Sequence, residues 1–472
     1  MTSTHRLLMA TALAGAMLPQ AALASAADFL ARHEVTLAEL DAGRALDERG
    51  LGFLSTNRMA NGAILFEGAA LQASDGRILV ADELMVSDTV VMLRNGVLSR
   101  DAENEAFSKV TLDSVLIEGP DAARIIMMGP DDVCAPVPAA NLGASRIEAQ
   151  GIRLSAPSLG HQAGMKADEE LSISSLEMGF TWTEDDCGSF DYLRMRSLSS
   201  ETPEGDSMTI AAFKASLEPG AAGQVRFDLS LSDAAFTSAA ADTVARAKDV
   251  RFVAAMPMAW LAEDAAEGGV EWGDPTAALM ALAGSNAELG IEVAGLELPM
   301  GELMPGHVLD RLQLDKDSRY GGSVNVTLEA SEGRLSFGHD LRLAGLANSA
   351  ASIAVAADPQ ALAAQASMGV LGIASAVNLI SATFSHEDLG LNETMKAATG
   401  RDLDTVIREA AGRIPAPSAA KAPIIDWLAS ALTSEGRVEA RPAHPVPLVQ
   451  IGMSLAMAPG SLVNILNLSV SE

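Results

Sequence analysis

The sequence predicts a mainly β fold: an elongated, curved antiparallel sheet with bulged strands, followed by a small α/β C-terminal region. Two observations lead to this fold class. From about Gly62 onward, apolar and polar residues alternate with a period of two, most clearly over residues 225–232, which is typical of a strand with one buried face. A second pattern, apolar-x-apolar-x-Gly-apolar-x-apolar, recurs in the same part of the chain. The first pattern predicts strands, and the second predicts how they bend.

The glycine pattern occurs at residues 64–71, 147–154 and 291–298, and its first six positions occur at 341–346. In a flat strand, the residue skipped at the glycine would turn the following apolar side chains to the opposite face. A β-bulge restores the face, because glycine tolerates a positive φ and the extra residue bends the strand. Several such strands side by side would form a curved sheet with an apolar concave side. The alternative is an ordinary β-sandwich whose glycines lie at edges and turns.

Residues 1–26 match a signal peptide. Arg6 ends a short n-region, residues 7–18 are apolar and uncharged, and Ala24 and Ala26 supply the small residues at −3 and −1 of the cleavage site. The apolar stretch is shorter than the roughly 20 residues of a membrane span, so we expect no stable span after cleavage. The composition is typical of bacterial proteins. The expected location is the periplasm, and secretion is the alternative.

Residues 27–60 are predicted as an N-terminal helical segment, with a helix over residues 28–45. Residues 61–350 are predicted as a β-rich body with weak strand repeats. Within this body, Asn95-Gly96 lies between two apolar runs, which predicts a hairpin with a two-residue turn. Further strands are predicted at residues 76–87, 109–118, 123–128, 170–182, 190–198, 207–217, 249–256 and 322–329.

Residues 351–472 are predicted as a mixed α/β region. Residues 359–385 contain no charged side chain, but they are rich in Ala, Ser, Gly and Gln, which gain little in lipid. A helix over 359–375 and a strand over 377–384 are therefore expected in place of a second membrane anchor. The remaining elements expected in this region are helices at 392–400, 402–411, 424–432 and 459–466, a linker at 414–423, a strand at 437–440 and an extended proline-rich segment at 442–447.

The chain has two cysteines, Cys134 and Cys187. Export would place them where disulfides persist, so a disulfide between them is the favoured prediction. The alternative is a metal site formed by both thiolates and the carboxylates beside them. No histidine lies close to either cysteine in the sequence, and no Cys-x-x-Cys motif is present.

The composition also restricts function. Lys and Arg number 32, Asp and Glu number 62, and the formal net charge is −30. This charge argues against nucleic acid as a partner and against docking on an anionic membrane surface. The 21 methionines include small clusters such as Met453 and Met457, for which core filling is expected in preference to copper binding.

The usual catalytic motifs are absent from the sequence: there is no Gly-x-Ser-x-Gly, no phosphate loop and no His-Glu-x-x-His. Residues 385–388 read Ser-His-Glu-Asp, but neighbours in sequence rarely converge on one site, so a polar turn after a strand is expected there. We predict no catalytic residues, no metal and no cofactor, and we do not expect an enzyme. A periplasmic hydrolase whose site assembles only in three dimensions is the alternative.

The leader, the bulged strands such as residues 291–298, and a C-terminal run together resemble poorly characterised bacterial periplasmic proteins related to the AsmA-like group. The C-terminal run comprises residues 341–346, 384–391, 441–448 and 459–470. In that group a curved β-groove with an apolar interior is thought to shelter lipid acyl chains between the two membranes. The better-known members keep an N-terminal anchor, whereas this chain has a cleavage site. The resemblance therefore implies binding or shuttling in place of bridging transport, and it implies no catalytic residues.

The predicted function is binding of an apolar ligand, a lipid, along a concave β face. The candidate lining residues are Ile147, Ile152, Leu154, Val293, Leu296 and Leu298. The alternative is that these residues fill a closed sandwich core. A second functional hypothesis is a non-enzymatic scaffold of the cell envelope that binds an envelope protein through exposed strand edges.

Overall fold

The protein is described here from a computed structural model. Every strand pairing given for the described residues is antiparallel and the sheet is not closed, so the fold is mainly β, as the sequence predicts. The chain divides into two compact units: unit 1 comprises residues up to Leu217 and Leu231–Asp242, and unit 2 comprises Glu218–Ser230 and the residues from Thr243 onward. The structure describes residues 29–31, 33–60, 62–72, 78–87, 89–99, 109–119, 122, 143–155, 170–182, 189–202, 205–220, 223–239, 243–261, 275–299, 319–331, 333–365, 368–412, 422, 425–426, 429 and 436–471.

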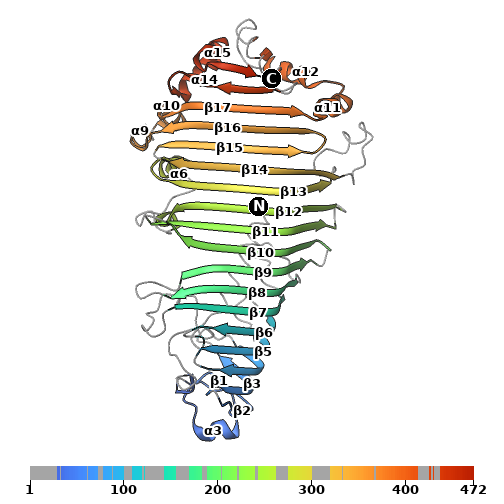
Figure 1. The fold of residues 1–472 in the computed structure, drawn as a ribbon, viewed down its shortest axis with the longest axis vertical. Helices are drawn as coiled ribbons and strands as arrows, with labels where there is room; N and C mark the ends of the chain where they lie inside the picture. The colour runs from blue at the N-terminus through green and yellow to red at the C-terminus, as the bar shows by residue number, and fades with distance from the viewer. Residues whose placement is uncertain are drawn as a thin grey trace. The chain divides into compact units, whose positions relative to one another are not determined.

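Unit 1 is an antiparallel meander. Each strand from β3 to β9 pairs with the next strand along the chain, up to β10, and the short strands β1 and β2 both pair with β3 (Figure 1). A short helix, α3, precedes them. The elements of unit 1 are α3 (Leu37–Ala42), β1 (Leu51–Gly52), β2 (Ser55–Arg58), β3 (Ile64–Gln72), β4 (Ile78–Val86), β5 (Val90–Ser99), β6 (Lys109–Glu118), β7 (Gly143–Ser155), β8 (Glu170–Trp182), β9 (Ser189–Glu201) and β10 (Ser207–Pro219). Strand β11 (Gln224–Ser238) contributes residues to both units.

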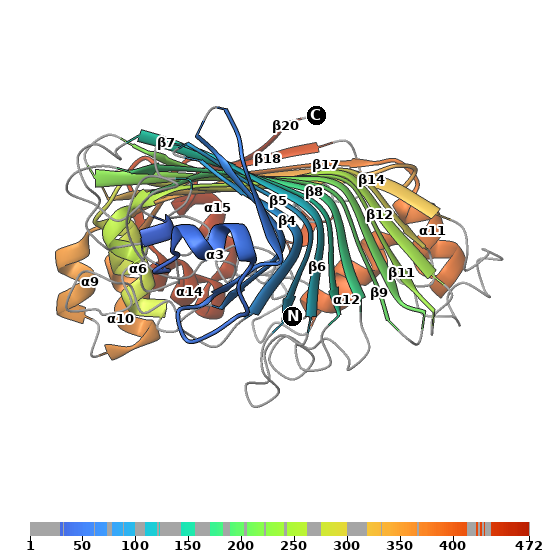
Figure 2. The same cartoon turned by 90° about the horizontal axis from the view of Figure 1, so that it is seen from below.

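A line of kinks crosses the sheet of unit 1. Every second strand has one residue in the left-handed conformation inside it: Gly68 with φ of 59°, Asn95 with 50°, Gly151 with 61° and Ser197 with 49°. The strand registers place these four residues in one row across β3 to β9. Each of them has no directly paired residue on the neighbouring strands, but the residues before and after it are paired in the same register. Figure 2 shows these strands bending along their length. The row of left-handed residues is the local cause of the bend.

At each kink, two consecutive side-chain positions point to the outer, polar face. In β7 these are Gln150 and Gly151, so Ile147 before the kink and Ile152 after it share the buried face. A Cβ at Gly151 would lie 2.0 Å from Oδ2 of Asp113, which explains why this position is a glycine. The positive φ and the shift of faces predicted from the glycine pattern are confirmed at Gly68, Gly151 and Gly295. Among these three positions, the extra residue of a β-bulge is seen only beside Gly295, where the register with β14 shifts; at Gly68 and Gly151 the register is unchanged on both sides.

The hairpin predicted at Asn95-Gly96 is wrong. Strand β5 runs without interruption from Val90 to Ser99. Asn95 does take the left-handed conformation that makes Asn-Gly a turn signal, but it does so as one of the kinks. Its Nδ2 donates a hydrogen bond to Oδ2 of Asp82 on the neighbouring strand, at 2.8 Å. The Asn-Gly sequence therefore predicts the left-handed conformation of Asn95 correctly, but the pairing of β5 with β4 and β6 makes this residue a kink within a strand and not a turn.

Unit 2 continues the antiparallel arrangement from β12 to β17, after which β18 and β19 both pair with β17, and β20 pairs with β18. Its strands are β12 (Thr243–Pro257), β13 (Ala287–Pro299), β14 (Arg319–Ser331), β15 (Arg334–Leu343), β16 (Ala347–Ala357), β17 (Val377–Asp388), β18 (Gly436–Ala440), β19 (Val446–Pro447) and β20 (Leu468–Ser471). Its helices are η4 (Met258–Leu261), α6 (Pro275–Ala283), α9 (Pro359–Gln365), α10 (Val370–Ala376), α11 (Leu391–Thr399), α12 (Leu403–Gly412), α14 (Leu448–Met457), η7 (Pro459–Ser461) and α15 (Leu462–Ile465).

Helices cover two parts of the unit 2 sheet (Figures 1 and 2). At one end of the strands, α6, α9 and α10 pack over a buried cluster that includes Trp260, Leu335, Leu362 and Val377. Along the C-terminal edge, α14 and α15 pack over a second cluster around Leu379. At the opposite end of the strands, α11 begins beside the turn between β15 and β16. The mixed C-terminal region predicted from the sequence is confirmed.

Several sequence predictions need correction. The helix expected over 28–45 is replaced by a short helical stretch at 29–31 and by α3, and the helix over 359–375 is two helices, α9 and α10. Gly345 has a φ of 73°, but it lies in the turn between β15 and β16, so no bulged strand forms at 341–346. The sequence predicts no element over residues 448–457, where the structure has helix α14. The extended proline-rich segment predicted just before it is confirmed, since residues 442–447 are not helical and Val446–Pro447 form β19.

Other predictions are confirmed. The strands expected at 76–87, 109–118, 170–182, 190–198, 207–217, 225–232, 249–256, 322–329, 377–384 and 437–440 all overlap observed strands. Gly400, with a φ of 73°, ends α11, and Oδ1 of Asp402 accepts the Thr405 backbone N–H at 2.9 Å as a cap of α12. The predictions for residues 1–26, residues 123–128 and the two cysteines lie outside the described residues, as does most of 414–432. Within the part of the chain that the structure describes, no helix has the length and apolar character needed to cross a membrane.

Candidate functional site

The apolar face of unit 1 is closed. Ile147 is 6% exposed, and Ile152 and Leu154 are each 1% exposed, although these three were candidates for lining an open groove. The same holds along the neighbouring strands, where Leu84, Leu93, Leu193 and Phe213 are all fully buried. These residues therefore pack as a core, which agrees with the closed-core alternative for this unit.

The other three candidates lie on β13 in unit 2. The register between β13 and β14 shifts between Val293 and Leu296, at the kink formed by Gly295. Because of this shift, Val293, Leu296 and Leu298 share one face of the sheet with Leu289. All four are half-buried. The structure thus separates the six candidates into three that are covered and three that are partly accessible.

The partly accessible face extends over the neighbouring strands of unit 2. Leu289 pairs with Leu328, Leu328 pairs with Phe337, and Phe337 pairs with Ile353. Directly paired residues of an antiparallel sheet share a face, so these side chains form one row. Ile291 on the same face is 45% exposed, Phe337 is 42% exposed and Ile353 is 41% exposed. We call this surface the apolar face of unit 2. It comprises Leu289, Ile291, Val293, Leu296, Leu298, Val324, Val326, Leu328, Phe337, Leu341, Ala351 and Ile353. The half-buried side chain of His339 lies on the same face, paired with Val326 and Ala351.

Helices limit the apolar face at its ends. Leu335, under the cluster formed by α6, α9 and α10, is 6% exposed, whereas Phe337, two residues further along β15, is 42% exposed. The helices therefore cover the apolar face at Leu335 but no longer cover it at Phe337, the next side chain of β15 on that face. The opposite face of the unit 2 sheet is polar. There Arg251 forms an ion pair with Asp228, and Arg226 forms an ion pair with Glu288. The sheet of unit 2 is amphipathic, with its apolar side partly uncovered.

Phe337 and Ile353 are not among the lining residues predicted from the sequence. Strand β15 reads Arg-Leu-Ser-Phe-Gly-His-Asp-Leu-Arg-Leu, an alternation of period two that could have predicted the strand and placed Phe337 on its apolar face. Strand β16 is rich in Ala and Ser, and nothing in its sequence singles out Ile353.

The outer face of unit 1 carries a basic hollow of about 300 Å³. It is lined mainly by polar and charged side chains, among them Arg146, Glu177, Arg194, Arg196 and Lys214. Tyr192 donates a hydrogen bond to Oε1 of Glu177 at 3.0 Å, and Arg146 donates one to the same oxygen at 3.0 Å. Burial alone would raise the pKa of Glu177, but these contacts hold it below its usual value. Burial and the bond to Glu177 raise the pKa of Tyr192. This arrangement is an ion-pair network on the polar side of the bend.

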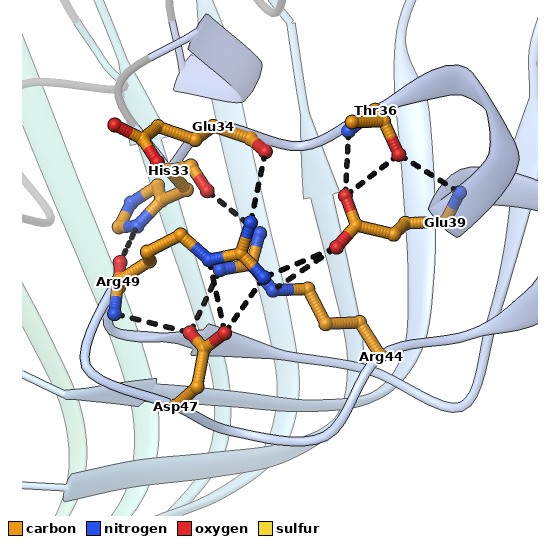
Figure 3. A network of polar contacts seen from close by, with 7 residues as sticks. All are labelled: His33, Glu34, Thr36, Glu39, Arg44, Asp47 and Arg49. Carbon is orange, nitrogen blue, oxygen red and sulfur yellow. Dashed lines mark hydrogen bonds and ion pairs between the residues drawn. The ribbon is translucent and has the colours of Figure 1, made fainter.

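A second polar network closes the N-terminal part of unit 1 (Figure 3). The side chain of Arg44 is 3% exposed and donates hydrogen bonds to the His33 carbonyl at 2.6 Å and to Oδ1 of Asp47 at 2.8 Å. Arg49 donates to Oδ2 of Asp47 through Nε at 2.9 Å and through Nη2 at 2.7 Å. The hydrogen bonds from Arg49 and Arg44 hold the pKa of Asp47 well below its usual value. Since each charged group here is paired with another, the network is structural in character.

The residues expected to form a polar turn at 385–388 instead lie at the end of β17. Ser385 pairs with Ala350 and His386 pairs with Ser349, so the two side chains point to opposite faces of the sheet. They therefore cannot act as a hydroxyl and its base. Among the described residues, no three His, Cys, Asp or Glu side chains come together as metal ligands. Met453 and Met457, expected in the core, are exposed on α14.

A scan against protein-family models finds no match for this chain, and a search of curated proteins finds no similar sequence.

Proposed function

We propose that the protein is a non-enzymatic, exported periplasmic protein that binds a lipid along the apolar face of unit 2. The observation that carries the proposal is the exposure of Ile291, Phe337 and Ile353 on one face of neighbouring strands. Contiguous exposed apolar surface on a soluble protein typically marks a binding site. The resemblance of the sequence to the AsmA-like group supports the same class of ligand.

The dimensions of the face suit an acyl chain. Neighbouring strands lie about 4.8 Å apart, so the three steps from β13 to β16, the strands that carry the face, span about 14 Å. An acyl chain fills half of a hydrocarbon core that is about 30 Å thick, which is about 15 Å. One chain could therefore lie across the strands between the helices at the two ends. Contacts would be made by aliphatic and aromatic side chains, which favour apolar ligands without requiring one shape.

A scaffold that pairs through sheet edges finds less support in the described residues. The edge strands β2 and β20 have four residues each, and Thr56 of β2 donates a hydrogen bond to the Leu40 carbonyl of α3. Short and covered edges oppose the addition of a partner strand. No observation favours the hydrolase alternative.

The test is native mass spectrometry of the mature protein purified from periplasm, with and without organic extraction. We expect a stoichiometric adduct with the mass of a phospholipid, lost on extraction and restored by added lipid. A clean protein mass that does not change when lipid is added would contradict the proposal. Binding of a protein in place of lipid would favour the scaffold.

A further inference from the structure

Two helices of unit 2 expose large apolar side chains to solvent. On α10 and just before it these are Met368, Val370 and Leu371, and on α14 they are Met453 and Met457, with exposures from 58% to 81%. The two helices lie against each other (Figure 2). We call these five side chains the uncharged helical surface. Their exposure is higher than that of the side chains on the apolar face of unit 2.

The segments that carry this surface lack charge. No Asp, Glu, Lys or Arg occurs in residues 359–385 or in residues 442–471, although the whole chain has 62 acidic residues and a net charge of −30. A surface exposed to water on all sides would ordinarily carry charged side chains for solubility. We therefore expect the uncharged helical surface to contact something that is itself apolar and carries no net charge.

We infer that the uncharged helical surface inserts its Met, Val and Leu side chains into the surface of a zwitterionic lipid bilayer. The surface has none of the Trp, Tyr or Arg side chains that form the hot spots of protein–protein interfaces, which argues against a protein partner, although Met is also common in such interfaces. A second copy of this chain is disfavoured because two molecules of charge −30 repel each other. Without basic residues, attachment depends on apolar insertion alone, so anionic lipid would weaken it.

This inference goes beyond the proposed function and does not depend on it. The buried cluster beneath α6, α9 and α10 includes Leu335, and Phe337 of the apolar face follows two residues later on β15. Ile373 of α10 and Leu448 of α14 pack against the same cluster. The helices that would contact the bilayer are thus the helices that limit one end of the apolar face. A lipid moving between the bilayer and the apolar face of unit 2 would need to pass only these helices.

The test is flotation of the full chain with phosphatidylcholine vesicles, and separately with vesicles that also contain phosphatidylglycerol. We expect the protein to float with phosphatidylcholine and to float less when phosphatidylglycerol is added at low salt. Leu371→Asp and Met457→Asp should each lower the bound fraction by about tenfold, since each places a charge in the bilayer surface. The matched control is Leu37→Asp on α3, because Leu37 is 70% exposed and Leu371 is 69% exposed. This control should float like the unmodified protein.

Three results would overturn the inference. The unmodified protein could fail to float with phosphatidylcholine, all three variants could float alike, or sedimentation could show a dimer that Leu371→Asp dissociates. Circular dichroism checks that each variant is folded. Native mass spectrometry of the same samples separates the two proposals. A protein that carries lipid but does not float contradicts only the bilayer contact, and a protein that floats without carrying lipid contradicts only the ligand site.

Discussion

Units 1 and 2 are both built from antiparallel strands, but the apolar faces of their sheets differ in how far they are exposed. In unit 1 a left-handed residue interrupts every second strand from β3 to β9, and the apolar face inside the bend is buried. In unit 2 the ladders from β14 to β16 run without interruption, and the apolar face remains partly exposed. The kink alone does not explain this difference, because β13 carries one at Gly295 and Ile291 on the same strand is 45% exposed. What differs is whether other parts of the chain cover the apolar face, as the helices over Leu335 do at one end of unit 2.

The largest expected effect compares two isoleucines. Ile152 in unit 1 is 1% exposed and Ile291 in unit 2 is 45% exposed. Ile152→Ala should lower the free energy of unfolding by about 2–5 kcal/mol, because it leaves a cavity in a closed core. Ile291→Ala should cost about 1 kcal/mol or less, because much of this side chain already meets water. Chemical denaturation measures both, and equal losses would contradict the distinction between the units.

The kink itself can be broken at Gly151. Gly151→Ala should lower the free energy of unfolding by about 2 kcal/mol, since a left-handed non-glycine residue costs about 1–2 kcal/mol and the new Cβ collides with Asp113. The double variant Gly151→Ala with Asp113→Ala should recover the part due to the collision. The control is Gly290→Ala in β13, where φ is not positive and no atom lies within 4 Å of the new Cβ. If the control is destabilised as much as Gly151→Ala, the kink is not the cause.

The closed end of unit 1 should depend on pH through Asp47. The pKa of Asp47 is lower in the folded protein than the value of about 3.9 in an unfolded chain, chiefly through the hydrogen bonds from Arg49 and Arg44. Its contribution to stability is therefore present above about pH 4 and is lost as the pH falls toward the folded pKa. Asp47→Asn should be less stable than the unmodified protein at pH 7, and the difference in melting temperature should shrink below pH 4.

The control for Asp47 is its exposed neighbour Glu48, for which the described residues offer no ion-pair partner. Glu48→Gln should melt like the unmodified protein at pH 7. A difference for Asp47→Asn that persists unchanged to pH 3 would rule out the ionised network as its source.

The smallest expected effect is a gain at Ser197. This residue holds a φ of 49° without being glycine. Ser197→Gly should relieve the cost of the left-handed conformation, offset by the greater entropy of glycine in the unfolded chain, for a net gain of about 0.5 kcal/mol. Thermal unfolding measures the gain. A clear loss of stability would show that the Ser197 side chain contributes more than its backbone costs.

Much of the fold could be predicted from the sequence, because alternation of period two and the glycine pattern are both local. The parity shift at Gly68, Gly151 and Gly295 is visible as a skipped residue, and the structure shows the positive φ that it requires. At Asn95 the sequence pattern Asn-Gly instead predicts a hairpin turn, although the residue has the same left-handed conformation. Only the pairing of β5 with β4 and β6 shows that the strand continues.

The difference between the two units could not be predicted in this way. Residues 147–154 and 291–298 carry the same pattern, yet Ile147 is 6% exposed while Ile291, at the same position of the pattern, is 45% exposed. Whether an apolar face is covered depends on residues far apart in the chain, such as the helices over Leu335, and not on the strand itself. Phe337 and Ile353 became candidates only once pairing of β15 with β16 brought them together.

The most direct test of lipid binding compares two adjacent residues of β16. Ile353 and Ser352 are both exposed, and they point to opposite faces of the same strand. Native mass spectrometry would measure the lipid carried by Ile353→Asp, by Ser352→Asp and by the unmodified protein. A charge on the apolar face should reduce the lipid adduct by about tenfold, while a charge on the polar face should leave it unchanged. Equal lipid occupancy in the two variants, or no adduct in the unmodified protein, would contradict a ligand site on the apolar face of unit 2.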